Sequence, residues 1–100
     1  MERQAKQIAE LLKVLANENR LLVLCELIKG AKTVSVLCEK IPDISQSALS
    51  QHLALLKARG VLDCTKSGQS VTYFIADHRV EEVIAVLYKH YCYQETGEGK

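Results

Sequence analysis

The chain has 100 residues, of which 48% are hydrophobic and 25% are charged, so it is large enough for one ordinary globular domain. Its formal net charge of +1 excludes a strongly basic or acidic protein, and any affinity for nucleic acid has to come from a local patch. No apolar stretch approaches the roughly 18 residues of a membrane-spanning helix, and the start MERQAKQIAE lacks the apolar core of a signal peptide, so we expect a cytoplasmic protein.

The first part of the chain predicts three helices joined by short connections. A first helix is expected over about 3–15, where four apolar residues at helical spacing form one face: Ile8, Leu11, Leu12 and Leu15. Asn17 is a suitable N-cap for a second helix, which ends near Gly30. The apolar face of this second helix consists of Leu21, Leu24, Cys25 and Ile28. A third, shorter helix is expected over about 34–41, because Pro42 and Asp43 would stop it.

A fourth helix is expected over about 46–59, with Ser45 as its cap and Gly60 at its end. A short helix, a tight turn and a longer helix predict a helix-turn-helix. The polar side chains near the start of the fourth helix suit the major groove of DNA, where Gln can bind adenine through two hydrogen bonds. The candidate DNA-contacting residues on this recognition helix are Ser45, Gln46, Ser47, Ser50, Gln51 and His52.

The next stretch predicts a β-hairpin, because two β-rich segments flank the turn sequence SGQS. A polar helix face alone could be a solvated surface, but a hairpin directly after it favours DNA binding. Lys66 beside the turn could reach a phosphate or the minor groove. The predicted fold is therefore mainly α, a winged helix-turn-helix in one domain over 1–100, with its wing over about 61–76.

The first and last helices lie outside this DNA-reading unit. Asp77 can cap a last helix over about 78–93. Its apolar face consists of Val80, Val83, Ile84, Leu87, Tyr88 and Tyr91. Because a small chain has little surface with which to cover two such faces, we expect a homodimer through the helices over about 3–15 and 78–93.

Three segments resemble the ArsR/SmtB family of bacterial winged-helix repressors: LKVLANENRLLVLCEL, SQSALSQHLALLKARGVL and SGQSVTYFIAD. The resemblance covers nearly the whole chain and implies a homodimer that binds double-stranded operator DNA with dyad symmetry until an inducer weakens binding. By position it implies that Ser47, Ser50, Gln51 and His52 lie in the major groove. It also implies three wing contacts, Lys66, Ser67 and Gln69.

The metal ligands of this family are largely missing from the chain. One class of sensors uses a CxC-type motif on the third helix, but KTVSVLCEKI offers only Cys38, and a single thiolate is a poor site for a soft metal. A second class uses carboxylates and histidines across the paired last helices. Asp77 and His90 match two of those positions, whereas Arg79 and Tyr93 occupy the other two. We expect no metal site and no cofactor; His78 could substitute only by a shift of one position, which would point it in another direction.

The four cysteines form no CxxC pair, so zinc fingers and thioredoxin-type motifs have no support. Cys25 and Cys92 resemble the thiol-based branch of the family, in which persulfides or oxidants link two cysteines through a disulfide or polysulfide bridge. For Cys38 and Cys64, packing is the simpler interpretation. The alternative is a repressor on the same fold that senses a metal or metalloid such as arsenite, zinc or cadmium. A soft ion could bridge the two thiols, with Cys38 or Cys64 as a third ligand.

An enzyme is not expected. A thiol enzyme needs a base and a group that orients it, and the three histidines belong to the fourth and last helices.

Overall fold

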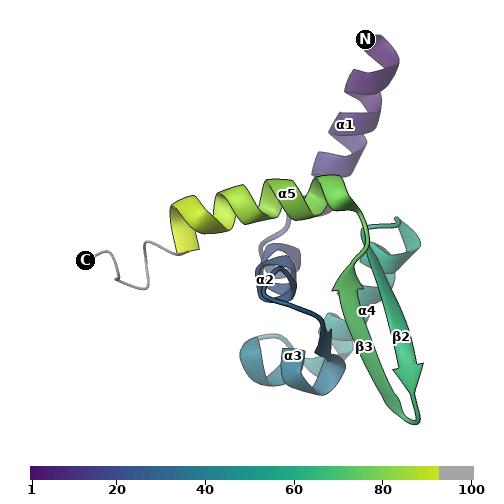
Figure 1. Ribbon diagram of the computed structural model, residues 1–100, viewed down its shortest axis with the longest axis vertical. Coiled ribbons are helices and arrows are strands. Elements are labelled where there is room, and N and C mark those ends of the chain that lie inside the picture. Colours follow the sequence, from purple (N-terminus) through teal and green to yellow (C-terminus); the bar gives the residue numbers. More distant parts are fainter. Residues whose placement is uncertain (93–100) are drawn as a thin grey trace.

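The computed structural model describes residues 1–92 of the chain, with the backbone alone described at Cys92. Helices dominate these residues, and a small sheet lies beside them (Figure 1). In chain order the elements are α1 (Glu2–Leu15), α2 (Glu18–Leu27), β1 (Lys32–Thr33), α3 (Val34–Lys40), α4 (Gln46–Ala58), β2 (Leu62–Ser67), β3 (Ser70–Ile75), α5 (His78–Leu87) and the π-helix η1 (Tyr88–Cys92). This arrangement confirms the predicted mainly α, winged helix-turn-helix fold. No helix among these residues is long and apolar enough to cross a membrane.

The predicted N-caps form as expected. Asn17 accepts hydrogen bonds from the backbone N–H of Asn19 and of Arg20, at 3.0 and 3.1 Å. Ser45 accepts from Ala48 N at 3.1 Å at the start of α4. Each cap satisfies backbone donors that have no partner inside the helix, so short polar side chains at these positions define where the helices begin.

The sheet contains one strand more than the hairpin that the sequence predicted. β1 was expected to be a connection, but Lys32 and Thr33 pair with Tyr73 and Thr72 of β3, which gives the strand order β1-β3-β2. A strand of two residues has no hydrophobic period to recognise, and it forms because β3 offers a free edge. At the wing tip, Ser67 pairs with Ser70, and Gly68 has a φ of 62°, as the first position of a two-residue type II′ turn requires.

The core lies between α2, α3, α4, the start of β2 and one face of α5. Its fully buried side chains include Val23, Leu24, Leu37, Leu49, Leu53, Leu56, Val61, Val80 and Ile84. On α4 the buried residues are the predicted apolar positions at helical spacing, so the recognition helix is held through the face opposite its polar one. On α2 the predicted face is only partly right: Val23, Leu24 and Leu27 are buried, whereas Leu21, Cys25 and Ile28 are half-buried, because the core contacts the helix on a neighbouring side.

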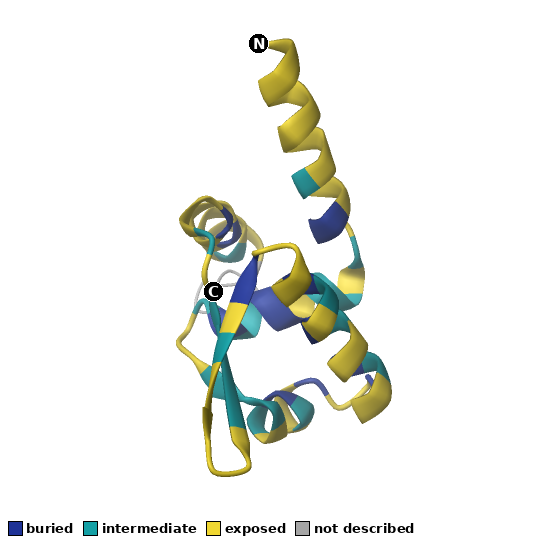
Figure 2. Cartoon of the chain, turned by 90° about the vertical axis from the view of Figure 1, so that its right-hand side faces the viewer, coloured by how far each residue is buried: buried dark blue, intermediate teal, exposed yellow. Residues whose placement is uncertain are grey.

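α1 differs from the other helices because it projects away from this body (Figures 1 and 2). Only Val14 and Leu15 in its last turn are buried, whereas Ile8 is 54% exposed and Leu12 is 51% exposed. α5 ends at Leu87, short of the expected end near 93, and continues as η1. The apolar faces of both helices are therefore only partly covered by their own chain.

Candidate DNA interface and sensor thiols

α4 presents a polar surface on the side away from the core. Leu49, Leu53 and Leu56 are buried against the protein. Five of the six candidate DNA-contacting residues of this helix are exposed: Ser45, Gln46, Ser47, Ser50 and Gln51. An amide and hydroxyl surface on an exposed helix has the size and the donor and acceptor groups needed to read base edges in a major groove.

His52 is placed differently from the other candidates. It is half-buried, and its Nδ1 accepts a hydrogen bond from Arg20 Nε at 3.3 Å. The partner lies on α2, thirty-two residues away in sequence. Arg20 was not among the predicted site residues, because nothing in the local pattern of α2 distinguishes it from a surface arginine.

The wing extends the polar surface beyond α4. Lys66, Ser67 and Gln69 are all exposed at or beside its tip. The hairpin reaches away from the body at the end opposite α1 (Figure 1). A cationic side chain on such an arm can bind a phosphate without a base contact.

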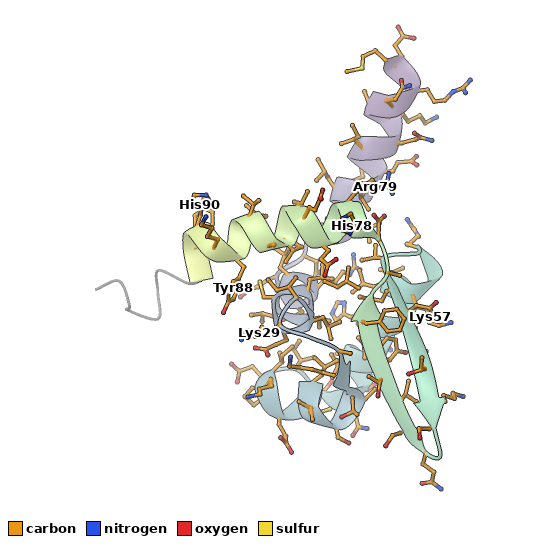
Figure 3. All side chains as sticks on the ribbon, in the orientation of Figure 1. Lys29, Lys57, His78, Arg79, Tyr88 and His90 are labelled. Atoms are coloured by element: carbon orange, nitrogen blue, oxygen red, sulfur yellow. The ribbon has the colours of Figure 1, made fainter. Side chains whose placement is uncertain are left out.

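Cys25 lies on a different face, where α2 meets the end of α5 and η1. It is half-buried and lines an apolar cavity of about 600 Å³. The other apolar side chains around this cavity include Leu21, Leu22, Ile84, Leu87, Tyr88 and Tyr91. Just beyond the end of α2, Lys29 also contacts η1: its Nζ lies 5.6 Å from the centre of the Tyr88 ring (Figure 3).

Cys92 is the last residue of η1, and its side chain lies outside the described residues. Its position relative to Cys25 is therefore described only by the helical segments that carry the two residues. Leu21 of α2, the helix of Cys25, and Tyr91 of η1, the helix of Cys92, line the same cavity.

The other two cysteines lie elsewhere. Cys38 is half-buried on α3 and packs against the core. Cys64 on β2 faces Tyr73 across the hairpin. Burial, and in second place the nearby Cys64, raises the pKa of Tyr73.

Two of the residues at the family's metal-ligand positions, Asp77 and Arg79, contact each other. Asp77 caps α5 by accepting from the backbone N–H of Arg79 at 2.9 Å, and its carboxylate also accepts from the Arg79 guanidinium at 2.7 Å. The hydrogen bond from the Arg79 side chain is the main reason that the pKa of Asp77 is lowered.

The two histidines of the last helical segment lie far apart. His78 lies 3.3 Å from Glu82 at the start of α5, and His90 is at the far end, in η1 (Figure 3). Within the described part of the chain, no group of three or more His, Cys, Asp or Glu side chains could hold a metal ion; Tyr93 lies outside it.

Comparisons with known proteins agree with this geometry. Residues 14–96 match the family model described as HxlR-like helix-turn-helix. The chain is 39% identical to the transcriptional activator HlyU of Vibrio cholerae over 92% of this chain and 84% of that protein. It is 36% identical to the biofilm growth-associated repressor of Agrobacterium fabrum, over 95% of this chain and 80% of that protein.

A solved structure described as reduced HlyU from Vibrio cholerae superposes with a TM-score of 0.86 at 39% identity, covering 92% of this chain and 96% of that one. The repressor SmtB of Mycobacterium tuberculosis is 33% identical over 81% of this chain and 59% of that protein, in agreement with an ArsR/SmtB-like fold. These relatives are transcriptional regulators and not enzymes. The chain therefore belongs to the HxlR-like helix-turn-helix family and is a DNA-binding transcriptional regulator.

Proposed function

We propose that the protein is a cytoplasmic, homodimeric repressor that leaves its operator when reactive sulfur species or oxidants bridge Cys25 and Cys92. The observation that carries this proposal is the shared cavity, which Cys25 lines from α2 and Tyr91 lines from η1, one residue before Cys92. One solved structure of the relative HlyU is described as reduced, and we carry a reduced resting state over to this chain.

The proposed chemistry needs two thiolates and a sulfur donor. The Cys25 thiolate attacks the outer sulfur of an organic persulfide, RSSH, which forms Cys–S–SH and releases RS⁻. The Cys92 thiolate then attacks the Cys25 sulfur, which forms a disulfide and releases HS⁻. A longer donor, R–S₄–R, reacts twice. Each cysteine thiolate displaces one RS⁻ end group, and the two inner sulfurs of the donor remain between the two cysteine sulfurs as a tetrasulfide bridge. A direct disulfide requires Cα atoms within about 7 Å, and a polysulfide bridge relaxes this limit.

The dimer is proposed from the apolar surface that a single chain leaves open. Leu12 of α1 is 51% exposed, and Val86 of α5 is 55% exposed. The partly exposed side chains on the two helices also include Ile8, Val83 and Leu87. Large apolar surfaces of this kind mark interaction sites, and a second copy would place two recognition helices on one duplex.

DNA reading is assigned to α4 and the wing. Gln51, with Gln46, Ser47 and Ser50, would meet base edges, and Ser45 at the helix N-terminus would meet a phosphate. Lys66, Ser67 and Gln69 would hold the wing on the backbone or in the minor groove. A bridge between α2 and η1 would shift α2 relative to α5, so that the two recognition helices no longer match successive major grooves.

The test combines DNA binding with intact mass spectrometry. The wild type and the variants Cys25→Ser and Cys92→Ser are exposed separately to polysulfide, peroxide, zinc and arsenite, with Cys38→Ser and Cys64→Ser as matched controls. We expect polysulfide to release DNA from the wild type and both controls and to add sulfur within a linked Cys25–Cys92 peptide. A fully responsive Cys25→Ser protein would refute the bridge, and release by arsenite or zinc with a bound metal mass would support the metal or metalloid sensor instead.

A further inference from the structure

Arg20, near the start of α2, contacts three helices through one side chain and its own backbone. Its Nη1 donates a hydrogen bond to the carbonyl oxygen of Val14 at 3.0 Å. Its Nε donates to His52 Nδ1 on α4 at 3.3 Å. Its backbone N–H donates to the Asn17 cap of α2 at 3.1 Å. The end of α1, the start of α2 and the recognition helix are therefore joined at one guanidinium.

The two side-chain contacts suit an arginine in particular. The Val14 carbonyl belongs to the last turn of α1, where carbonyls have no partner inside the helix. The guanidinium is planar, stays charged and can only donate, so it can hold two acceptors in fixed directions. In the described part of the chain, Arg20 forms no ion pair with a carboxylate. Its side-chain hydrogen bonds go to the carbonyl oxygen of Val14 and the ring nitrogen of His52.

The hydrogen bond from Arg20 occupies one of the two ring nitrogens of His52. Because the guanidinium can only donate, Nδ1 acts as the acceptor in this hydrogen bond, which leaves Nε2 as the ring nitrogen that can donate. His52 also lies on the half-buried flank of α4 together with Ala48 and Leu55, between the buried face and the groove-facing residue Gln51. Arg20 therefore fixes both the orientation of the ring and the nitrogen that His52 can offer as a donor.

We infer that Arg20 is a positioning residue for DNA recognition. It holds α4 at a fixed orientation to α1 and α2 through His52, and it leaves the Nε2–H of His52 as a donor toward DNA. The inference rests on the proposed role of α4 as the reading helix. It assigns His52 a second function, as the link between that helix and α2.

The test uses two matched pairs of variants of the full chain. Arg20→Met removes both donors, and Arg20→Lys keeps the charge without the planar fork. His52→Asn keeps an acceptor near the position of Nδ1, and His52→Leu removes it. The probes are a duplex selected by the wild type from a random library and a scrambled duplex of the same composition, and ¹⁵N NMR reports the His52 tautomer.

We expect Arg20→Met to weaken binding of the selected duplex about five- to tenfold, as the loss of one typical hydrogen bond predicts, and to change scrambled binding less than about twofold. Arg20→Lys should fall between the wild type and Arg20→Met. His52→Asn should bind better than His52→Leu. Adding Arg20→Met to His52→Leu should cause a smaller loss than Arg20→Met causes alone, because the hydrogen bond between Arg20 and His52 is already broken and only the bond to Val14 remains to be lost. The wild-type ring should show the Nε2–H tautomer, and the ring in Arg20→Met should show a mixture.

Equal losses on both duplexes, additive losses in the double variant or an Nδ1–H tautomer in the wild type would overturn the inference. If Arg20→Met does not fold, the His52 pair and the wild-type tautomer still decide it. Gln51→Ala separates this inference from the proposed function. A loss of selected binding in Gln51→Ala with none in Arg20→Met removes the role of Arg20 alone, whereas no loss in Gln51→Ala removes α4 as the reading helix.

Discussion

Replacing Asp77 by alanine should destabilise the helix that carries the proposed dimer face. Asp77 Oδ1 accepts from Arg79 N at 2.9 Å and from Val80 N at 3.4 Å, and the side chain is 13% exposed. Loss of an N-cap of this kind costs about 1 kcal/mol, which corresponds to a fall of about 4–8 °C in Tm for a domain of this size. The ion pair with Arg79 should add little, because the guanidinium is exposed to solvent and screened.

Thermal unfolding at one fixed protein concentration measures this loss, and Asp77→Asn is its matched control. Asparagine keeps the oxygen that caps α5 but lacks the charge, so it should lose less than half as much stability as alanine. The pKa of Asp77 is lowered in the folded protein, so its charge stabilises the fold above about pH 4. That contribution should be lost as the pH falls through the lower, folded pKa. An asparagine variant as unstable as the alanine variant, or a difference from the wild type that does not change with pH, would refute the capping argument.

Further outcomes are expected from the interface and the thiols. Gln51→Ala should weaken operator binding by about 1–3 kcal/mol in fluorescence anisotropy if it makes a two-bond contact to adenine, and equal loss on random DNA would contradict base reading. Cys25→Ser should bind operator normally but no longer respond to polysulfide, whereas a preserved response would exclude the bridge. Leu12→Glu should shift the protein toward monomer in sedimentation and lower operator affinity, and an unchanged dimer would remove α1 from the interface. Zinc should leave operator binding of the wild type unchanged, and zinc-dependent release would point to a metal site.

Much of the fold could be predicted because it is encoded locally. The N-caps at Asn17, Ser45 and Asp77 each satisfy backbone donors two or three residues away, so they can be recognised from short stretches. The buried face of α4, at Leu49, Leu53 and Leu56, follows directly from helical spacing. Together these local signals define a helix-turn-helix with a polar outer surface.

The candidate site was less predictable, because part of it depends on residues far apart in the chain. The hydrogen bond between Arg20 and His52 joins positions that no periodicity relates. His52 could therefore be identified as polar and close to the groove, but its attachment to α2 could not be foreseen.

The sequence by itself determined the helices, the hairpin and the polar face of the recognition helix, since each depends on side chains within one or two turns of each other. Only the tertiary structure decided three further features. The edge of β3 turns Lys32 and Thr33 into a strand. The packing of α2 against α5 and η1 places Cys25 in the wall of an apolar cavity. The guanidinium of Arg20 joins α1, α2 and α4. Each of these features needs the folded chain to bring its parts together, because contacts between distant segments leave no local pattern in the sequence.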